Sequence, residues 1–314
     1  DWVAIGNPGN APQSPANRLH IYDQGDGFGA VGYNYSISRN ETTIAQYADF
    51  LNAVATTDPY NLYNPNMASN GNIAGVARTG SPGSYSYSVI GSGNRPITYV
   101  SWFDAARFAN WLHNGQQTGP GAALTAEDGA YTLLGATSGI IAKNVGATIW
   151  IPGEDEWFKA AYYDPTHMSG AGGYWFHANR SESMTSNDIG VPGAANHWAG
   201  DYATTPGSQT YSPTQNYLTE AGAYGPGSQS YYGINDMAGN VWEWTDGVEG
   251  SSRVMRGGTY TNGAFSVGSA SRFIFYPPTS EDPQLGFRLA SIPEPATTVL
   301  TLLFGSMLLR RRRR

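Results

Sequence analysis

Apolar side chains recur at helical spacing along residues 44–54 of this sequence. Intervals of three to four residues place such side chains on one face of an α-helix, where they can be buried together. The preceding Thr42 or Thr43 is a residue type that caps helix N-termini. The pattern therefore predicts an amphipathic helix. Its apolar face consists of Ile44, Tyr47, Leu51 and Val54.

A second helix is predicted after Ser101. This residue and Asp104 resemble a capping box, with Asp in the position that Glu or Gln usually holds. The helix continues over Ala105–His113, and a short strand over Pro96–Val100 precedes it. The side chains expected on one face of this helix are Ala105, Phe108, Ala109 and Leu112.

A third helix begins near Glu154, where three acidic residues follow one another. Carboxylates in a first helical turn are stabilised by the positive end of the helix macrodipole. The alternative is a catalytic role for Glu154, Asp155 and Glu156. The helix start explains the three acids without catalysis, so we prefer the structural interpretation.

The rest of the chain is expected to be irregular apart from short strands. Tyr33–Ile37 alternates and predicts a strand, whereas residues 1–30 are rich in Gly, Asn and Pro without any period. Clusters of turn residues predict long loops further along the chain. These loops cover 57–95 with a hairpin around Tyr85–Ile90, 114–148 with another hairpin, and 164–232.

The composition agrees with a loop-rich domain built on aromatic side chains. The 314 residues include 40 Gly, 21 Tyr and 9 Trp, and only 13% are charged. The net charge is 17 − 24 = −7, but residues 310–314 are all Arg, so residues 1–309 carry 12 − 24 = −12. Phosphate contacts need clustered Lys and Arg, so no nucleic-acid partner is expected. Cysteine is absent, which excludes disulfides, thiolate metal sites and cysteine nucleophiles.

Three motifs rich in Gly and Trp lie in the last third of the chain. Gly233–Trp244 reads Gly-Ile-Asn-Asp-Met-Ala-Gly-Asn-Val-Trp-Glu-Trp, Arg256–Tyr260 reads Arg-Gly-Gly-Thr-Tyr, and Gly286–Ala290 reads Gly-Phe-Arg-Leu-Ala. In order and spacing they resemble the core of the formylglycine-generating enzyme family, also called the sulfatase-modifying factor family. Further blocks that resemble this family are Arg39–Val54, Val100–Leu112 and Trp150–Ala161.

The resemblance implies a single α+β domain over residues 15–291, loop-rich, with few short helices and strands. The expected fold is this family's type of C-type lectin-like fold. An irregular lead-in over residues 1–14 and a tail over residues 292–314 would flank the domain.

The resemblance also implies structural calcium. In the second calcium loop of the family, two carboxylates and two backbone carbonyls bind the ion, which suits Ca²⁺ better than a transition metal. The matching residues are Asp236 and Glu243 for the carboxylates, and Gly239 and Val241 for the carbonyls. In the first loop, the Asn196 side chain and the His197 carbonyl match, but the stretch 204–209 lacks the carboxylate that normally completes the site. Asp201 is a substitute that we consider there.

Formylglycine generation by the family's copper mechanism is excluded. Two cysteines bind Cu(I) in those enzymes, and the matching positions here are Asn262 and Val267. No copper is therefore expected. The iron enzymes of the superfamily use a His-x-x-x-His-x-Glu pattern, and no two of the five histidines here are four residues apart. His177 and His197 share one irregular segment and remain the pair to examine for a redox site.

Two functions are open at this point. In variable proteins with the same fold, the stretch between the second and third motifs binds ligands, so the first is a non-catalytic module for a surface polysaccharide or a protein. Tyr, Asn and Arg make adaptable contacts there. The second is an extracellular enzyme with altered chemistry in the same cleft. The candidate ligand-binding residues are Trp242, Thr259, Tyr260, Asn262, Phe265 and Arg272.

The C-terminal tail resembles a PEP-CTERM sorting signal. Pro293-Glu294-Pro295 is followed by an apolar run over residues 296–309 and by the five arginines. Such tails are cleaved by an exosortase-type enzyme, so the run would anchor the chain in the inner membrane only transiently. As a helix it spans roughly 21 Å, less than the ~30 Å hydrocarbon core. We expect export to the surface or extracellular matrix of a Gram-negative bacterium; an ordinary C-terminal anchor is the alternative.

Overall fold

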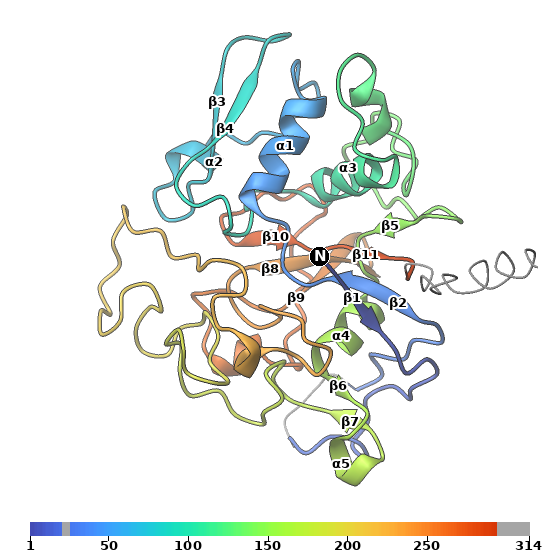
Figure 1. Cartoon of the computed structure of the whole chain (residues 1–314), viewed down its shortest axis with the longest axis vertical. Helices are drawn as coiled ribbons and strands as arrows, with labels where there is room; N and C mark the ends of the chain where they lie inside the picture. Colours follow the sequence, from blue (N-terminus) through green and yellow to red (C-terminus); the bar gives the residue numbers. More distant parts are fainter. Residues whose placement is uncertain (21–25, 294–314) are drawn as a thin grey trace, which may run out of the picture.

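A computed structural model describes residues 1–20 and 26–293 of the chain. It is a single domain of mixed α and β structure with few helices and short strands (Figure 1). The helices are α1 (Ile44–Val54), α2 (Asn66–Ser69), α3 (Trp102–His113), α4 (Glu154–Tyr162) and α5 (His167–Gly170). Three short 3₁₀ turns cover Ala122–Ala126, Pro226–Ser228 and Ala264–Val267. None of the helices in the described part of the chain is both long enough and apolar enough to cross a membrane.

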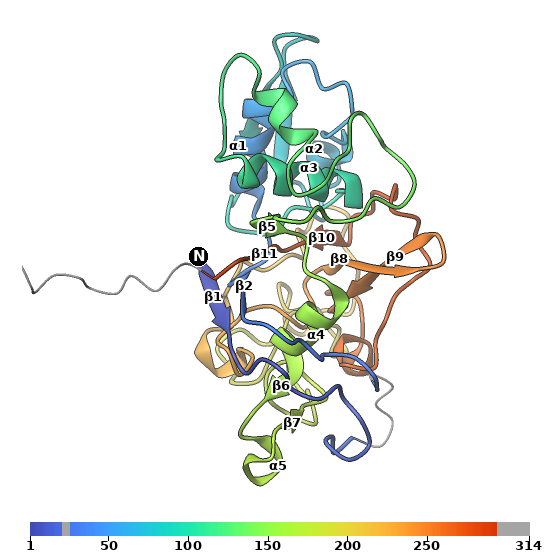
Figure 2. The ribbon, with the colours of Figure 1, turned by 90° about the vertical axis from the view of Figure 1, so that its right-hand side faces the viewer.

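Two small sheets lie at the centre of the molecule. One has four strands in the order β1-β2-β11-β5 and the other has three in the order β10-β8-β9. The helices α1 and α3 and the hairpin β3–β4 lie on one side of these sheets, and α4, β6, β7 and α5 lie on the other (Figures 1 and 2). The strands are β1 (Trp2–Ile5), β2 (Tyr35–Ser38), β3 (Val76–Thr79), β4 (Ser86–Val89), β5 (Ile149–Trp150), β6 (Tyr163–Asp164), β7 (Gly173–Tyr174), β8 (Trp242–Glu249), β9 (Ser252–Arg256), β10 (Leu285–Phe287) and β11 (Ala290–Ser291).

The three predicted helices are confirmed, and so are the caps predicted for the first two. Thr43 is the N-cap of α1 and forms a capping box with Gln46. Ser101 and Asp104 form the capping box of α3, in which the Asp104 carboxylate accepts the Ser101 N–H at 2.7 Å. The predicted apolar positions of α1 are all buried. Local sequence thus determines where these helices begin and which faces they bury.

The prediction of an irregular N-terminal segment is wrong at residues 2–5. This segment forms β1, which pairs antiparallel with β2 and places Trp2 opposite Ser38 and Ile5 opposite Tyr35. Val3 and Ile5 are buried against the core. The β-propensity of four residues is too weak to predict a strand from sequence. Pairing with β2 supplies the additional stabilisation that makes this segment a strand.

Three further predictions need correction. The hairpin expected around Tyr85–Ile90 is present, but its other strand is β3, which begins earlier at Val76. Pro96–Val100 forms no strand: Pro96 only bridges to Thr43, and Tyr99 has a φ of 58°, which ends extended structure. The hairpin expected within 114–148 is reduced to one bridge between Tyr131 and Lys143.

Candidate functional site

A fully buried ion pair joins two of the sequence motifs. The Arg288 guanidinium donates to both Glu243 carboxylate oxygens at 2.6 Å, and the Trp157 indole N–H donates to the same carboxylate at 2.7 Å. Arg288 also donates to the carbonyls of Asn235 and Asp236. The pair therefore holds the loop before β8 against the end of β10, and its partners satisfy the buried charges.

The Gly-Gly motif makes a turn in which Gly258 has no room for a side chain. Gly257 and Gly258 have φ values of 100° and 77°. A Cβ on Gly258 would lie 2.6 Å from Val267 Cγ1, and L-residues rarely adopt such angles. This tight turn directs the following residue, Thr259, into the interior, where it is fully buried.

The acidic start of α4 serves the structure in this region. Glu154 accepts hydrogen bonds from Arg256 at 2.6 Å and from Arg272 at 2.8 Å. Asp155 accepts the backbone N–H of Gly29, and Glu156 accepts the Tyr33 hydroxyl and the Trp150 indole N–H. All three carboxylates thus have structural partners, as the helix-start interpretation expects.

A cleft of about 450 Å³ opens beside these motifs. One wall is aromatic: Phe273 packs on Trp242 with ring centroids 5.4 Å apart and on Tyr276 at 5.1 Å. The remaining wall is polar and contains both amide and hydroxyl groups. The lining residues are Trp242, Asn262, Ser266, Ala270, Ser271, Arg272, Phe273, Tyr276, Asp282 and Gln284.

A hydrogen-bond network fixes the floor of this cleft. Asn262 Oδ1 accepts the backbone N–H of Thr259 at 2.9 Å, and the Thr259 hydroxyl lies 3.2 Å from Gln284 Oε1. The Thr261 hydroxyl lies 2.9 Å from that of Thr259. The amide side chains of Asn262 and Gln284 are therefore held in place by bonds to the Gly-Gly motif, which preorganises them for a ligand.

Sequence reasoning missed a carboxylate in this cleft. Asp282 accepts the backbone N–H of Gln284 at 3.0 Å and the Tyr276 hydroxyl at 3.3 Å. The negative charge of Asp282 raises the pKa of Tyr276 above its ordinary value. The signal available in the sequence was the position of Asp282. It lies two residues before Gln284, where the candidate ligand-binding stretch ends and the chain returns to the sheet.

The structure brings together only part of the predicted ligand-binding set. Trp242, Asn262 and Arg272 line the cleft, and Thr259 lies beneath it. Tyr260 is buried away from the cleft, and its ring stacks on Tyr217 with centroids 5.6 Å apart and planes 7° apart. Phe265 is 53% exposed and packs on Phe176 outside the cleft.

The positions of the two missing cysteines differ in exposure. Asn262 lines the cleft, whereas Val267 is fully buried beneath Gly258. An amide and an aliphatic side chain offer no thiolate for Cu(I).

The predicted second calcium loop retains oxygens without partners. Among the described residues, the buried carbonyls of Gly239 and Val241 accept no hydrogen bond. Asp236 accepts the N–H of Gly222 at 2.6 Å, and burial raises its pKa to about 6. Glu243 differs, because Arg288 already occupies both of its oxygens. Asp236 and the two carbonyls are therefore oxygen ligands of the type that Ca²⁺ prefers, while Glu243 would have to share its lone pairs.

The predicted first loop has fewer free ligands. The Asn196 amide donates to the Tyr217 carbonyl and to Asn240, and the His197 carbonyl accepts the Asn187 amide at 3.1 Å. Asp201, the proposed substitute, also accepts from Asn187 at 3.2 Å. The Asn187 amide thus lies between the oxygens that a cation would need.

The two histidines of the shared segment are both buried near one another. Burial, together with the charges of the neighbouring His197 and His20, lowers the pKa of His177 to about 4. The His20 ring stacks on the Phe176 ring with centroids 3.9 Å apart. Within residues 1–20 and 26–293, no group of three or more His, Cys, Asp or Glu side chains is arranged to hold a metal ion.

Comparison with known proteins agrees with this architecture. CarF is 21% identical, with 94% of this chain and 98% of CarF covered and a TM-score of 0.54. Variable protein 1 of Treponema denticola is 18% identical, with 93% and 95% covered and a TM-score of 0.51. At such identities the likeness shows the fold alone.

Among curated proteins, none matches this chain. The model of the sulfatase-modifying factor enzyme 1-like domain matches residues 30–292, which is most of the chain and includes all three motifs. The protein therefore belongs to the family of sulfatase-modifying factor enzyme 1-like domains, and its fold is that of the formylglycine-generating enzymes.

Proposed function

We propose that this protein is a non-catalytic binding module of the bacterial cell surface or extracellular matrix, and that its ligand is a surface polysaccharide. The cleft beside the Gly-Gly motif carries this proposal. Trp242, Phe273 and Tyr276 offer aromatic surface for a sugar ring, and Asn262 and Gln284 offer amide groups for its hydroxyls. A protein ligand is the alternative within the same class.

Export through the C-terminal tail is part of the same proposal. The predicted sorting signal lies almost wholly outside the described residues, which end at Pro293. Its support is the sequence alone: Pro-Glu-Pro, a short apolar run and five arginines follow one another. Cleavage by an exosortase-type enzyme would release the domain from the inner membrane. Mass spectrometry of the mature protein from an exosortase-positive bacterium tests this, and an intact arginine tail would contradict it.

We include structural calcium in the proposal because buried carbonyl oxygens need partners. Gly239, Val241 and Asp236 would hold the ion at the loop before β8, and Ca²⁺ would supply a positive charge beside the two carbonyl oxygens that have no donor. Mass spectrometry of protein purified in calcium-containing buffer should find near one calcium per chain. Absence of calcium under those conditions would contradict this part of the proposal.

A blocking substitution tests the binding function. Ser266→Trp places an indole in the cleft, and Ser251→Trp adds the same side chain in the exposed turn between β8 and β9. On an array of bacterial polysaccharides, the wild type and the Ser251 variant should bind the same glycan. The Ser266 variant should bind it at least about tenfold more weakly, because a blocked cleft forfeits the contacts of its anchoring residues.

Two results would contradict the proposal. If the Ser266 variant binds as well as wild type, the ligand does not occupy this cleft. If no polysaccharide binds, the ligand class is wrong and a protein ligand takes its place.

A second candidate function is an extracellular enzyme, and the observation that favours it is Asp282. This carboxylate lines the cleft with the Tyr276 hydroxyl beside it, so the cleft contains a potential proton acceptor. Incubation of a bound glycan with the protein distinguishes the two functions. Fragments that appear with the wild type but not with Asp282→Asn would favour the enzyme.

A further inference from the structure

A second cavity, of about 410 Å³, lies between the helices α1 and α3 on one side and the strands β1 and β2 on the other. It shares no lining residue with the cleft beside the Gly-Gly motif. Figures 1 and 2 both show these helices on one side of the central sheet that contains β1 and β2. The volume lies within the range of small-molecule sites, roughly 300–1,000 Å³.

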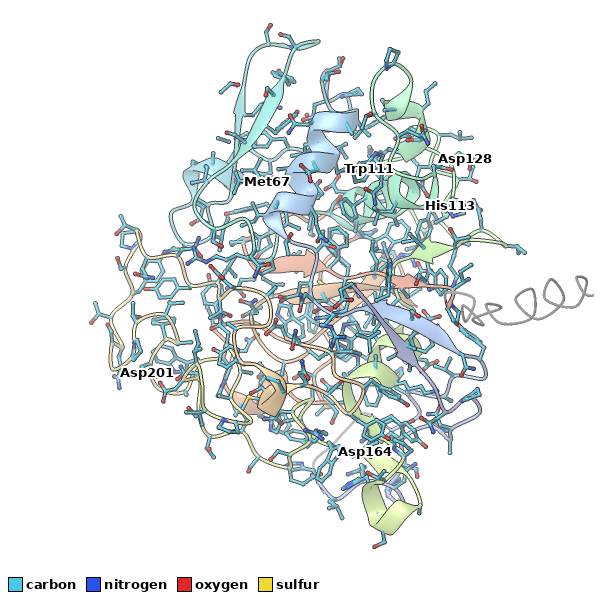
Figure 3. The ribbon with its side chains drawn as sticks, in the orientation of Figure 1. Met67, Trp111, His113, Asp128, Asp164 and Asp201 are labelled. Atoms are coloured by element: carbon cyan, nitrogen blue, oxygen red, sulfur yellow. The ribbon has the colours of Figure 1, made fainter. Side chains whose placement is uncertain are left out.

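Aromatic rings form the apolar part of its wall. Phe108 and Trp111 of α3 line the cavity with ring centroids 5.8 Å apart, and Trp2 of β1 lines it from the strand side. Trp111 packs on Phe50 of α1 at 5.5 Å, which fixes the ring between the two helices (Figure 3). Phe108 and Trp111 are almost fully buried, so this part of the wall is rigid.

The polar part of the wall is acidic. Asp1, Glu41 and Asp49 all line the cavity, and no lysine, arginine or histidine does so. The Asp1 carboxylate is paired with the nearby Arg39 at 2.8 Å. Asp49 lies on the exposed side of α1 and carries no counter-ion among the described residues. The cavity therefore has an uncompensated negative charge at its edge.

Glu41 adds an acceptor without a donor. Its side chain is 1% exposed, and its Oε2 accepts the Asn240 amide at 3.1 Å. Its Oε1 is buried and accepts no hydrogen bond from any residue that the structure describes. Buried acceptors are normally satisfied, so this oxygen indicates a missing donor.

The helix terminus at the same place offers no free donors to an anionic guest. The N-terminus of α1 reaches the cavity through Thr43 and Gln46, but its backbone N–H groups are already used. Ile44 donates to the Arg95 carbonyl and Ala45 to the Gly93 carbonyl. The first turn of α1 thus offers neither free N–H groups nor a basic side chain to an anion.

We propose that this cavity binds a small organic cation, namely an amine or quaternary ammonium compound with a short apolar body. The aromatic faces of Trp2, Phe108 and Trp111 receive the apolar body and attract the cationic head. The Asp49 carboxylate compensates its charge, and Glu41 Oε1 is the buried acceptor available to a donor group of the ligand. The site is separate from the polysaccharide cleft and does not depend on the function proposed for that cleft.

Choline and its uncharged isostere 3,3-dimethyl-1-butanol are the probes for a first test. Both have the same branched head, and only choline carries the charge. Isothermal titration of the full chain should show binding of choline, and binding of the alcohol should be at least about tenfold weaker. Equal affinity for the two probes, or no choline binding at about 10 mM, would overturn the proposal.

A matched pair of variants tests whether the cation binds beside Asp49. Asp49→Asn removes the carboxylate at the cavity edge, and Asp128→Asn makes the same change at an exposed acid outside the cavity (Figure 3). Both positions are on the surface, so both variants should fold. The Asp49 variant should bind choline about three- to tenfold more weakly, while the Asp128 variant should bind as wild type does. Equal effects of the two substitutions would place the cation elsewhere and contradict the assignment.

The substitution Ser266→Trp distinguishes the proposed cation cavity from the proposed polysaccharide cleft. It blocks the polysaccharide cleft and lies outside the cation cavity. Choline affinity should be unchanged in this variant. A loss of choline binding in Ser266→Trp would show that choline occupies the cleft beside the Gly-Gly motif.

Discussion

Two regions of this domain are held together by different means. The helical region, residues 44–113, contains α1, α3 and the hairpin β3–β4, and it is held by apolar helix faces. The loop region, residues 175–241, contains no α-helix or strand and only the 3₁₀ turn Pro226–Ser228. Both regions are nevertheless ordered parts of the same fold (Figure 1).

Buried amide side chains replace secondary structure in the loop region. Asn240 Oδ1 accepts the Asn196 amide at 2.9 Å and the N–H of Thr219 at 3.1 Å. The Asn240 amide donates to Glu41, and the Asn196 amide donates to the Tyr217 carbonyl. Irregular backbone cannot pair its own polar groups in a regular way, so side chains must satisfy them. Stability in this region therefore depends on a few polar residues rather than on a large apolar face.

The largest effect is expected where the loop region meets the sheets. Arg288→Met keeps a similar side-chain length but leaves Glu243 buried without its counter-ion. Chemical denaturation should show a loss of about 3–5 kcal/mol in unfolding free energy. Arg39→Met, which breaks the exposed pair with Asp1, should cost at most about 1 kcal/mol. Similar losses for both variants would mean that burial of the ion pair does not matter.

Calcium removal is expected to have the next largest effect, and it should act on the loop region alone. At one hundred times the dissociation constant, a bound ion contributes about 2.7 kcal/mol, so chelation should lower the melting temperature by roughly 5 °C. Hydrogen exchange should become faster in residues 233–243 and stay unchanged in the helix α3. An unchanged melting temperature would contradict the proposal that calcium stabilises this domain.

A smaller effect on stability is expected from the loss of a buried asparagine, which can be compared with an exposed asparagine that makes similar hydrogen bonds. Asn240 is 1% exposed, whereas Asn52 on α1 is exposed and joins β4 by accepting from and donating to Tyr87. Asn240→Ala should cost about 1–3 kcal/mol, because it leaves buried groups unsatisfied, and Asn52→Ala should cost less than about 1 kcal/mol. Equal costs in thermal unfolding would show that the loop region does not depend on its buried amides.

The helical region could be predicted from the sequence because its signals are local. The caps of α1 and α3 lie within three residues of the groups that they bind, and the apolar period appears in a single window. The motif pattern likewise placed Trp242, Asn262 and Arg272, which line the cleft.

The loop region and part of the site could not be predicted, because their partners are distant in the chain. Asn240 and Glu41 are 199 residues apart, and no periodic pattern indicates that they meet. Asp282 belongs to an irregular segment that only the fold brings against Trp242. Tyr260 faces inward because Tyr217, from another loop, stacks on its ring. Contacts of this kind depend on topology rather than on propensity.

The pairing of β8 with β10 has a consequence for where the cleft lies. The two strands run parallel, with Leu285 opposite Trp242 and Phe287 opposite Trp244, and β9 pairs with β8 on its other side. The segment from Gly257 to Gln284, which supplies most of the cleft, therefore leaves and rejoins one sheet at fixed positions. Both ends of this segment are therefore fixed by the register of the same three strands, so the position of the cleft is set by the sheet.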